Sequence, residues 1–241
     1  KNQDVFTLEI GMGIRDEIYR TTGHYPYVII NNLHRTRLDP NRNIAEAADG
    51  DKNAELAWHQ FQNYIDGAVK EGQNAFGKGL YIDLHGHRHD IKRTELGYLI
   101  SSDELQLDDE LLDFDSFVEY SSIRSLVNNN LNGLSLSQLV RGSSSFGSLF
   151  EAMGYPTVPS SRIPFPGPDE PFFSGGYNTA RHGSSQGGTI DAIQIELDED
   201  LRRDMSKRNK LVSDLAFTII AFLRIHYFQD SDFVREMAPA K

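Results

Sequence analysis

The spacing of apolar residues along the chain predicts three long helices. Apolar side chains recur at helical intervals over about residues 7–22, 58–72 and 205–228. Gly23 directly follows the first pattern, where a glycine commonly ends a helix. The third pattern contains the longest apolar run, residues 215–223, which is too short to span a membrane. We therefore interpret this run as part of a buried helix.

Three shorter, largely apolar runs predict buried strands at residues 27–30, 79–84 and 189–197, and the first of them is rich in β-branched residues. A long segment that contains a predicted helix joins the first two runs, as a crossover between parallel strands does. The order of these elements predicts an α/β fold with a parallel sheet. All of it fits a single domain, residues 1–241, whose last part, 229–241, is a polar tail.

The middle of the chain is less regular. Short helices are predicted around residues 123–127, 136–140 and 146–153. A proline-rich stretch follows from Pro156 to Pro171 and predicts an irregular segment. We expect it to be an ordered loop, because Phe165, Phe172 and Phe173 are large apolar residues that would otherwise remain in water.

Composition narrows the classes of partner. The chain has 24 basic and 35 acidic residues, a net charge of −11, which argues against nucleic acid and anionic membranes as partners. It has no cysteine, so disulfides, thiolate zinc sites and a cysteine nucleophile are excluded, and a cytoplasmic location is favoured. An acidic substrate stays open, because a local group of arginines can outweigh the overall charge. The oligomeric state is left open.

Three of the eight histidines lie within five residues, directly after the strand predicted at 79–84. In an extended segment His85, His87 and His89 point to one side, and Asp83 stands two residues before His85. Imidazole is a common zinc ligand, and a nearby carboxylate can ligate or orient it. The alternative is a solvated turn. The position after a buried strand favours metal ligation by His85, with Asp83 and His87 as further candidates.

Two other polar groups follow predicted strands, where ligands gather in parallel α/β sheets. Glu196 ends the strand at 189–197, and a glutamate beside an activated water is a common general base in hydrolysis. A surface glutamate is the alternative. The loop after residues 27–30 offers Arg35, Arg37, Asn41 and Arg42, which suit a substrate carboxylate, unless the arginines pair internally.

A glycine-rich segment, residues 174–188, contains Arg181 and His182. It lacks the Gly-Lys-Ser/Thr sequence of a phosphate-binding loop. We interpret it as a mobile lip over a site, in which Arg181 and His182 contact substrate. A flexible surface loop without a function is the alternative.

Three blocks together resemble the N-formylglutamate amidohydrolase family: "NNLHRTRLDPNR", "YIDLHGH" and "GGYNTARHG" followed by "AIQIEL". They span roughly residues 31–197. The resemblance implies a fold like that of the zinc carboxypeptidases and aspartoacylases, with a mixed, largely parallel central sheet flanked by helices. It also implies zinc-dependent hydrolysis of an amide in an N-acyl amino acid or small peptide with a free carboxylate. Formylglutamate is one candidate substrate.

By the same resemblance His85 is a ligand of one zinc ion and Glu196 is the catalytic base. Asn41 and Arg42 resemble the pair that holds the substrate carboxylate, and Arg37 an accessory arginine. We expect His85, Glu196 and Arg42 to converge on one cleft.

One feature of the family is missing. The larger superfamily takes two zinc ligands from a His-x-x-Glu pattern after its first strand, and this sequence contains no such pattern. We expect the chain to lack that first strand and loop, and to bind zinc weakly as it stands. The second functional hypothesis is therefore a binding or structural protein that has lost the family's chemistry.

Overall fold

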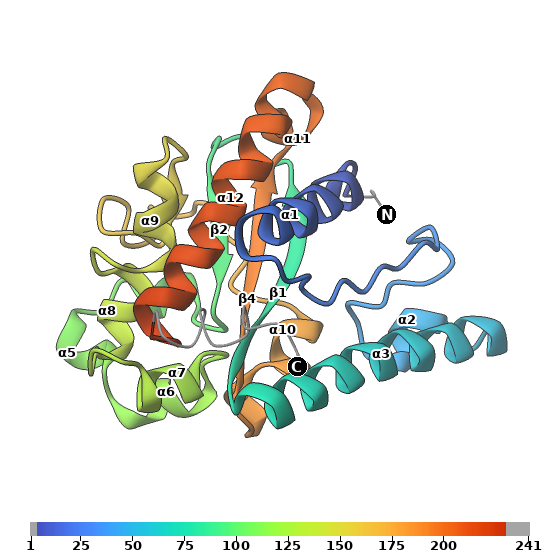
Figure 1. The fold of residues 1–241 in the computed structure, drawn as a ribbon, viewed down its shortest axis with the longest axis horizontal. Coiled ribbons are helices and arrows are strands. Elements are labelled where there is room, and N and C mark those ends of the chain that lie inside the picture. Colours follow the sequence, from blue (N-terminus) through green and yellow to red (C-terminus); the bar gives the residue numbers. More distant parts are fainter. Residues whose placement is uncertain (1–3, 230–241) are drawn as a thin grey trace, which may run out of the picture.

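The computed structural model describes residues 4–229, which form an α/β fold around a four-stranded sheet (Figure 1). The strands are β1 (Gly79–His87), β2 (Thr94–Gly97), β3 (Thr157–Val158) and β4 (Ile190–Asp198), in the order β1-β4-β2-β3. β1 pairs with β4 in parallel, β2 pairs with β3 in parallel, and β2 pairs with β4 antiparallel. The predicted fold class, a mixed and mostly parallel sheet flanked by helices, is confirmed.

The three long helices form where the apolar spacing predicts them. α1 (Thr7–Thr22) ends at Gly23, which adopts the left-handed conformation, and α12 spans Met205–His226. α3 (Lys52–Phe76) begins at Asp51, whose side chain caps two backbone N–H groups, and continues past Gly72 to Gly77. The shorter helices are α2 (Ile44–Ala48), α4 (Ser102–Leu105), α5 (Asp109–Leu112), α6 (Asp115–Tyr120), α7 (Arg124–Asn129), α8 (Leu136–Arg141), α9 (Phe146–Ala152), α10 (Tyr177–His182), the 3-10 turn Ser184–Gln186 and α11 (Glu199–Arg203).

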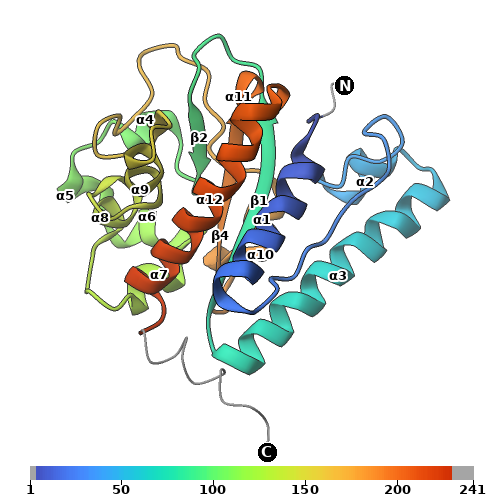
Figure 2. The same cartoon turned by 45° about the horizontal axis from the view of Figure 1, so that its top comes forward.

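Along β1 and β4, alternate residues point to opposite faces of the sheet, and one of these faces is apolar and the other polar. Leu84 of β1 pairs in register with Ile195 of β4, and both belong to the hydrophobic core beneath α1 and α12. Figure 2 shows these two helices in front of β1 and β4, and α10 behind them. α10 contacts the opposite, polar face: Thr179 Oγ1 lies 3.2 Å from Asp83 Oδ2. The sheet therefore has one conventional core face and one face of buried polar residues.

The strand predicted at residues 27–30 is wrong. These residues run between α1 and α3 without regular secondary structure, and Tyr27 and Ile30 are 61% and 39% exposed. A β-branched run becomes a strand only when a neighbouring strand accepts its backbone hydrogen bonds, and none of the described residues pairs with it. The parallel pair is instead β1 with β4, over a hundred residues apart.

The middle of the chain follows the predictions in part. The three predicted short helices are α7, α8 and α9, but the acidic stretch before them also forms α4, α5 and α6. The proline-rich segment is irregular apart from β3. Phe172 packs against the core, whereas Phe165 and Phe173 remain 41% and 43% exposed.

None of the helices within residues 4–229 is long and apolar enough to cross a membrane. Residues 230–241, most of the predicted polar tail, lie outside the described residues.

Candidate functional site

The candidate site occupies the polar face of the sheet, where in-register pairing brings side chains from β1 and β4 together. Asp83 pairs with Gln194, His85 with Glu196, and His87 with Asp198. In a sheet, residues paired in register point to the same side. β2 adds Glu95, which lies opposite Glu196. The sequence thus concentrates ionisable groups on one buried surface.

His85 is held between two carboxylates. Its Nδ1 lies 3.0 Å from Asp4 Oδ2, and its Nε2 lies 3.1 Å from Asp83 Oδ1. Burial alone would lower the pKa of His85, but Asp83, Asp4 and Glu196 raise it well above its ordinary value. Burial likewise opposes ionisation of Asp4, but His85 and Arg35 leave the pKa of Asp4 lowered. His85 is therefore an imidazolium that donates to both carboxylates at neutral pH.

Glu196 is 5% exposed and accepts a hydrogen bond from Gln194 Nε2 at 2.7 Å. Burial, with the nearby charges of Asp4 and Asp83, raises its pKa to about 7, although His85 and Gln194 act in the opposite direction. A carboxyl group that titrates near neutral pH can both accept and donate a proton there.

Asn41 brings the arginine-rich loop to the site. Its Oδ1 accepts the backbone N–H of Asn178 at 3.0 Å, and its Nδ2 lies 3.3 Å from His85 Nε2. A Cβ on Gly176 would lie 2.6 Å from Asn41 Nδ2, so glycine is required there for this close approach. The start of α10 and the loop thus fix Asn41 against His85.

Arg202, only 1% exposed, fixes the strand ends on the other side of the sheet. Its guanidinium donates to the carbonyl oxygens of Leu197, Val5 and His87 at 2.7–3.0 Å. Because Val5 follows Asp4, Arg202 also holds the segment that places Asp4 beside His85.

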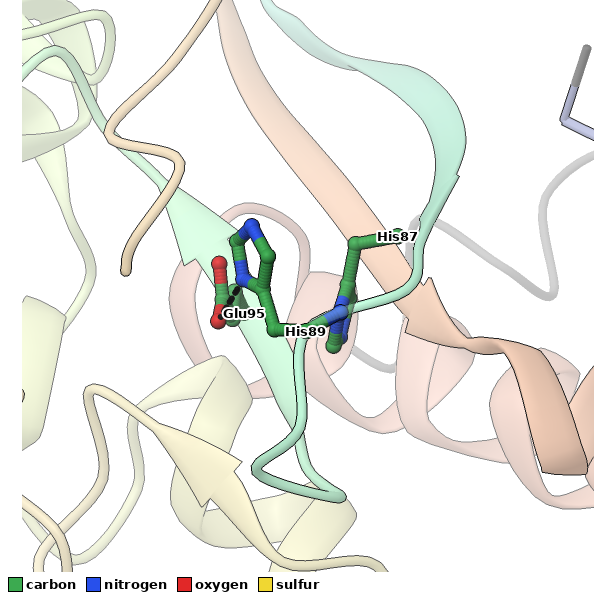
Figure 3. Close-up of side chains that lie close together, drawn as sticks. All are labelled: His87, His89 and Glu95. Atoms are coloured by element: carbon green, nitrogen blue, oxygen red, sulfur yellow. Dashed lines mark hydrogen bonds and ion pairs between the residues drawn. The ribbon is translucent and has the colours of Figure 1, made fainter. Parts of the chain in front are cut away.

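A second polar cluster lies at the end of β1 and consists of His87, His89 and Glu95 (Figure 3). Of the three histidines, His85 and His87 lie on the same face of β1, whereas His89 follows the strand and its ring packs 4.8 Å from that of His87. Burial lowers the pKa of His87. The structure thus separates His85 from the other two histidines.

Of the predicted substrate-binding arginines of the loop, Arg35 lies next to the site through Asp4, whereas Arg37 and Arg42 do not reach His85. Arg35 pairs with Asp39 at 3.1 Å, as the structural alternative predicts, and also approaches Asp4 at 3.7 Å. Arg37 and Arg42 are exposed, and the guanidinium of Arg42 donates to the backbone carbonyl of its neighbour. His85 and Glu196 lie side by side, but no contact joins Arg42 to them among residues 4–229.

Arg181 and His182 belong to α10 and not to a mobile lip. Arg181 is exposed and pairs with Asp66 at 3.1 Å. His182 is buried, with Nε2 2.6 Å from Gln62 Oε1, and burial lowers its pKa to about 4 despite the nearby Asp66. It is a neutral residue that packs against Tyr81 beneath the site.

A cavity of about 1120 Å³ runs along the edge of β1 that does not face β4. Apolar side chains of α1 and α3 and residues 27–30 line most of it, while Asp4, Asp83, His85 and Asn41 line one part. A molecule bound in this cavity would therefore contact Asp4, Asp83, His85 and Asn41.

The donors around His85 fall short of a catalytic zinc site. His85 Nε2 and Asp83 Oδ1 lie together, but Asp4 contacts the opposite ring nitrogen. A catalytic zinc ion takes about three protein ligands. Within residues 4–229 the converging set of three is instead His87, His89 and Glu95.

Several residues of the site escape the sequence patterns. Asp4 and Arg202 follow no motif, and Glu95 lies on a strand too short to show a period. Gln194 is the exception, because the alternation of β4 already places it on the same side as Glu196. No family model, curated protein or solved structure matches this chain.

Proposed function

We propose that this protein is a metal-dependent amide hydrolase that acts on an N-acyl amino acid or a small peptide with a free carboxylate. The observation that carries the proposal is the placement of Glu196, a buried carboxyl with a pKa of about 7, beside the His85 imidazolium. The blocks that resemble N-formylglutamate amidohydrolases support the reaction type. They also support zinc as the metal, although the donors at His85 do not complete a site for it.

The chain's own residues would perform the proton transfers. Glu196 accepts a proton from the water that attacks the amide carbon and then delivers it to the departing amine nitrogen. The Asn41 side-chain N–H, beside His85, donates to the carbonyl oxygen, and the positive charge of the His85 imidazolium, whose own N–H groups stay on Asp4 and Asp83, stabilises the negative charge that develops there. Arg37 and Arg42, exposed on the adjacent loop, attract the substrate carboxylate.

The test is the turnover of Glu196→Gln on a panel of N-acyl amino acids, including N-formylglutamate, in the presence of Zn²⁺. We expect a fall in kcat of about a hundredfold or more with little change in KM, because glutamine keeps the size of the side chain but cannot accept the proton. Glu199→Gln, at a partly exposed glutamate directly after β4, is the matched control and should keep normal turnover. Near-normal turnover of Glu196→Gln would remove Glu196 from the role of base.

A second candidate is a binding or structural protein on the same fold. The observation that favours it is that both ring nitrogens of His85 already contact carboxylates. In that case the wild-type chain hydrolyses no member of the panel. Wild type and Glu196→Gln would then differ only in stability.

A further inference from the structure

The side chains of His87, His89 and Glu95 face one another at the end of β1. Their donor atoms all lie within 4.8 Å of one another (Figure 3). His87 and Glu95 are almost completely buried, whereas the His89 side chain is 18% exposed and provides access from solvent. The cluster comes from the end of one strand, the connection after it and the next strand, β2.

Two of the three side chains are held by a hydrogen bond to a partner outside the cluster. His87 Nε2 donates to the carbonyl oxygen of Arg93 at 2.7 Å, which leaves Nδ1 as an acceptor, and Nδ1 now accepts the backbone N–H of His89 at 3.1 Å. A metal-binding histidine commonly donates its other N–H to a backbone carbonyl in this way. Glu95 Oε2 accepts the N–H of Phe173 at 2.9 Å, which leaves Oε1 facing His89 Nδ1 at 2.9 Å.

We propose that His87, His89 and Glu95 bind a divalent transition metal of the Zn²⁺ type, at a site separate from His85. Two imidazoles and one carboxylate are a donor set that zinc accepts, with water in the remaining position. Tetrahedral zinc with bonds of about 2.1 Å separates its donors by about 3.4 Å, so the three side chains need only small movements. A bound metal would displace to solvent the proton between His89 Nδ1 and Glu95 Oε1, and the backbone at His89 would rotate so that its N–H gives up the hydrogen bond to His87 Nδ1.

The surrounding charges allow a cation in this place. Arg93 is the nearest positive group, with Nε 3.7 Å from Glu95 Oε1, but its Nη1 pairs with Glu170 at 2.5 Å. Asp198, in register with His87, adds a further buried carboxylate, and Lys92 approaches it at 3.3 Å from the exposed side. Glu95, Glu170 and Asp198 thus balance the cations Arg93, Lys92 and Arg202, whose Nη2 lies 3.0 Å from the His87 carbonyl oxygen, so the two imidazole rings meet no net positive charge.

The test is calorimetric titration of the chelator-treated full chain with Zn²⁺. We expect one ion per chain. His89→Phe should lower the affinity at least about tenfold, because it removes a ligand. Phenylalanine keeps an aromatic ring stacked on Phe173, so the packing is retained. His85→Ala, the matched control at the other cluster, should keep the wild-type affinity within about twofold. Circular dichroism checks that both variants fold.

A second measurement needs no variant. On addition of Zn²⁺ the imidazole NMR signals of His87 and His89 should shift, while that of His85 should not. The proposal is overturned if wild type binds no Zn²⁺ at micromolar concentration, if His89→Phe binds as tightly as wild type, or if His85 alone responds. Because the readout is binding, its failure is distinct from failure of the proposed hydrolase activity.

Discussion

Glu196→Gln should change the stability of the metal-free protein in a pH-dependent way. The unfolded chain has a Glu196 pKa near 4.5, whereas burial in the folded protein raises the pKa to about 7. Below about pH 4.5 the carboxyl is protonated in both states. Between pH 4.5 and 7 the unfolded chain releases a proton that the folded chain keeps, so the free energy of unfolding falls as the pH rises. Above about pH 7 the loss is complete.

The size of the effect follows from the two pKa values. At about 1.4 kcal/mol per pH unit, the interval between 4.5 and about 7 corresponds to about 3 kcal/mol of destabilisation in alkaline solution. Glutamine cannot ionise and keeps an oxygen to accept the hydrogen bond from Gln194. Relative to wild type, the variant should therefore gain about 2 kcal/mol of stability between pH 5.5 and pH 8.

Urea denaturation at pH 5.5 and pH 8, with a chelator present, measures this gain. Burial lowers the pKa of His182 to about 4 in the folded protein, against 6.5 in the unfolded chain. As the pH falls below 6.5 the unfolded chain therefore binds a proton that the folded protein does not, and the free energy of unfolding falls. This opposite trend is common to both proteins and cancels in their difference. Glu110→Gln makes the same chemical change on the surface and should alter stability by less than about 0.5 kcal/mol at either pH. A difference between Glu196→Gln and wild type that does not vary with pH would show that Glu196 is ionised at pH 5.5 in the folded protein.

Two further predictions test the groups that position the site, both by urea denaturation. Gly176→Ala brings a methyl group within 2.6 Å of Asn41 and should lower the free energy of unfolding by about 1–3 kcal/mol. Gly67→Ala, in a helix with open space around it, should instead raise that free energy by about 0.5–1 kcal/mol. Arg202→Lys cannot reach all three carbonyl groups that the guanidinium binds and should cost about 3 kcal/mol or more, whereas Arg203→Lys, in an exposed ion pair, should cost less than about 0.5 kcal/mol. Equal losses within either pair would contradict the assigned contacts.

The sequence predicts what repeats locally and misses what depends on distant partners. The helical spacing of α1, α3 and α12 and the apolar runs of β1 and β4 are local patterns, and each of these elements forms. Residues 27–30 have the same local pattern as a strand, but strand formation also requires a partner, which the pattern does not report.

Among the residues of the site, too, those that follow a local pattern could be predicted from the sequence and the others could not. His85 and Glu196 could be predicted because each ends a recognisable strand, and the register of β1 with β4 then sets them side by side. Asp4 could not be predicted, because it belongs to no helix or strand. Its place beside β1 depends on Arg202, which donates to the backbone carbonyl of the neighbouring Val5, 197 positions away in sequence. Arg42 was expected on the site from the family pattern, but only its neighbour Asn41 reaches His85.

The composition of the two sheet faces bears on the choice between an enzyme and a structural protein. The face beneath α1 and α12 carries Leu84, Ile195 and similar residues, which stabilise the sheet by burial alone. The opposite face is equally enclosed, yet it carries Glu196 with its pKa raised to about 7 and His85 between two carboxylates. Burying such groups lowers stability, and apolar residues at the same positions would avoid the loss. A fold that already uses apolar pairing on one face needs no ionisable cluster on the other for its stability. The cluster is therefore better explained by proton transfer or ligand binding than by structure.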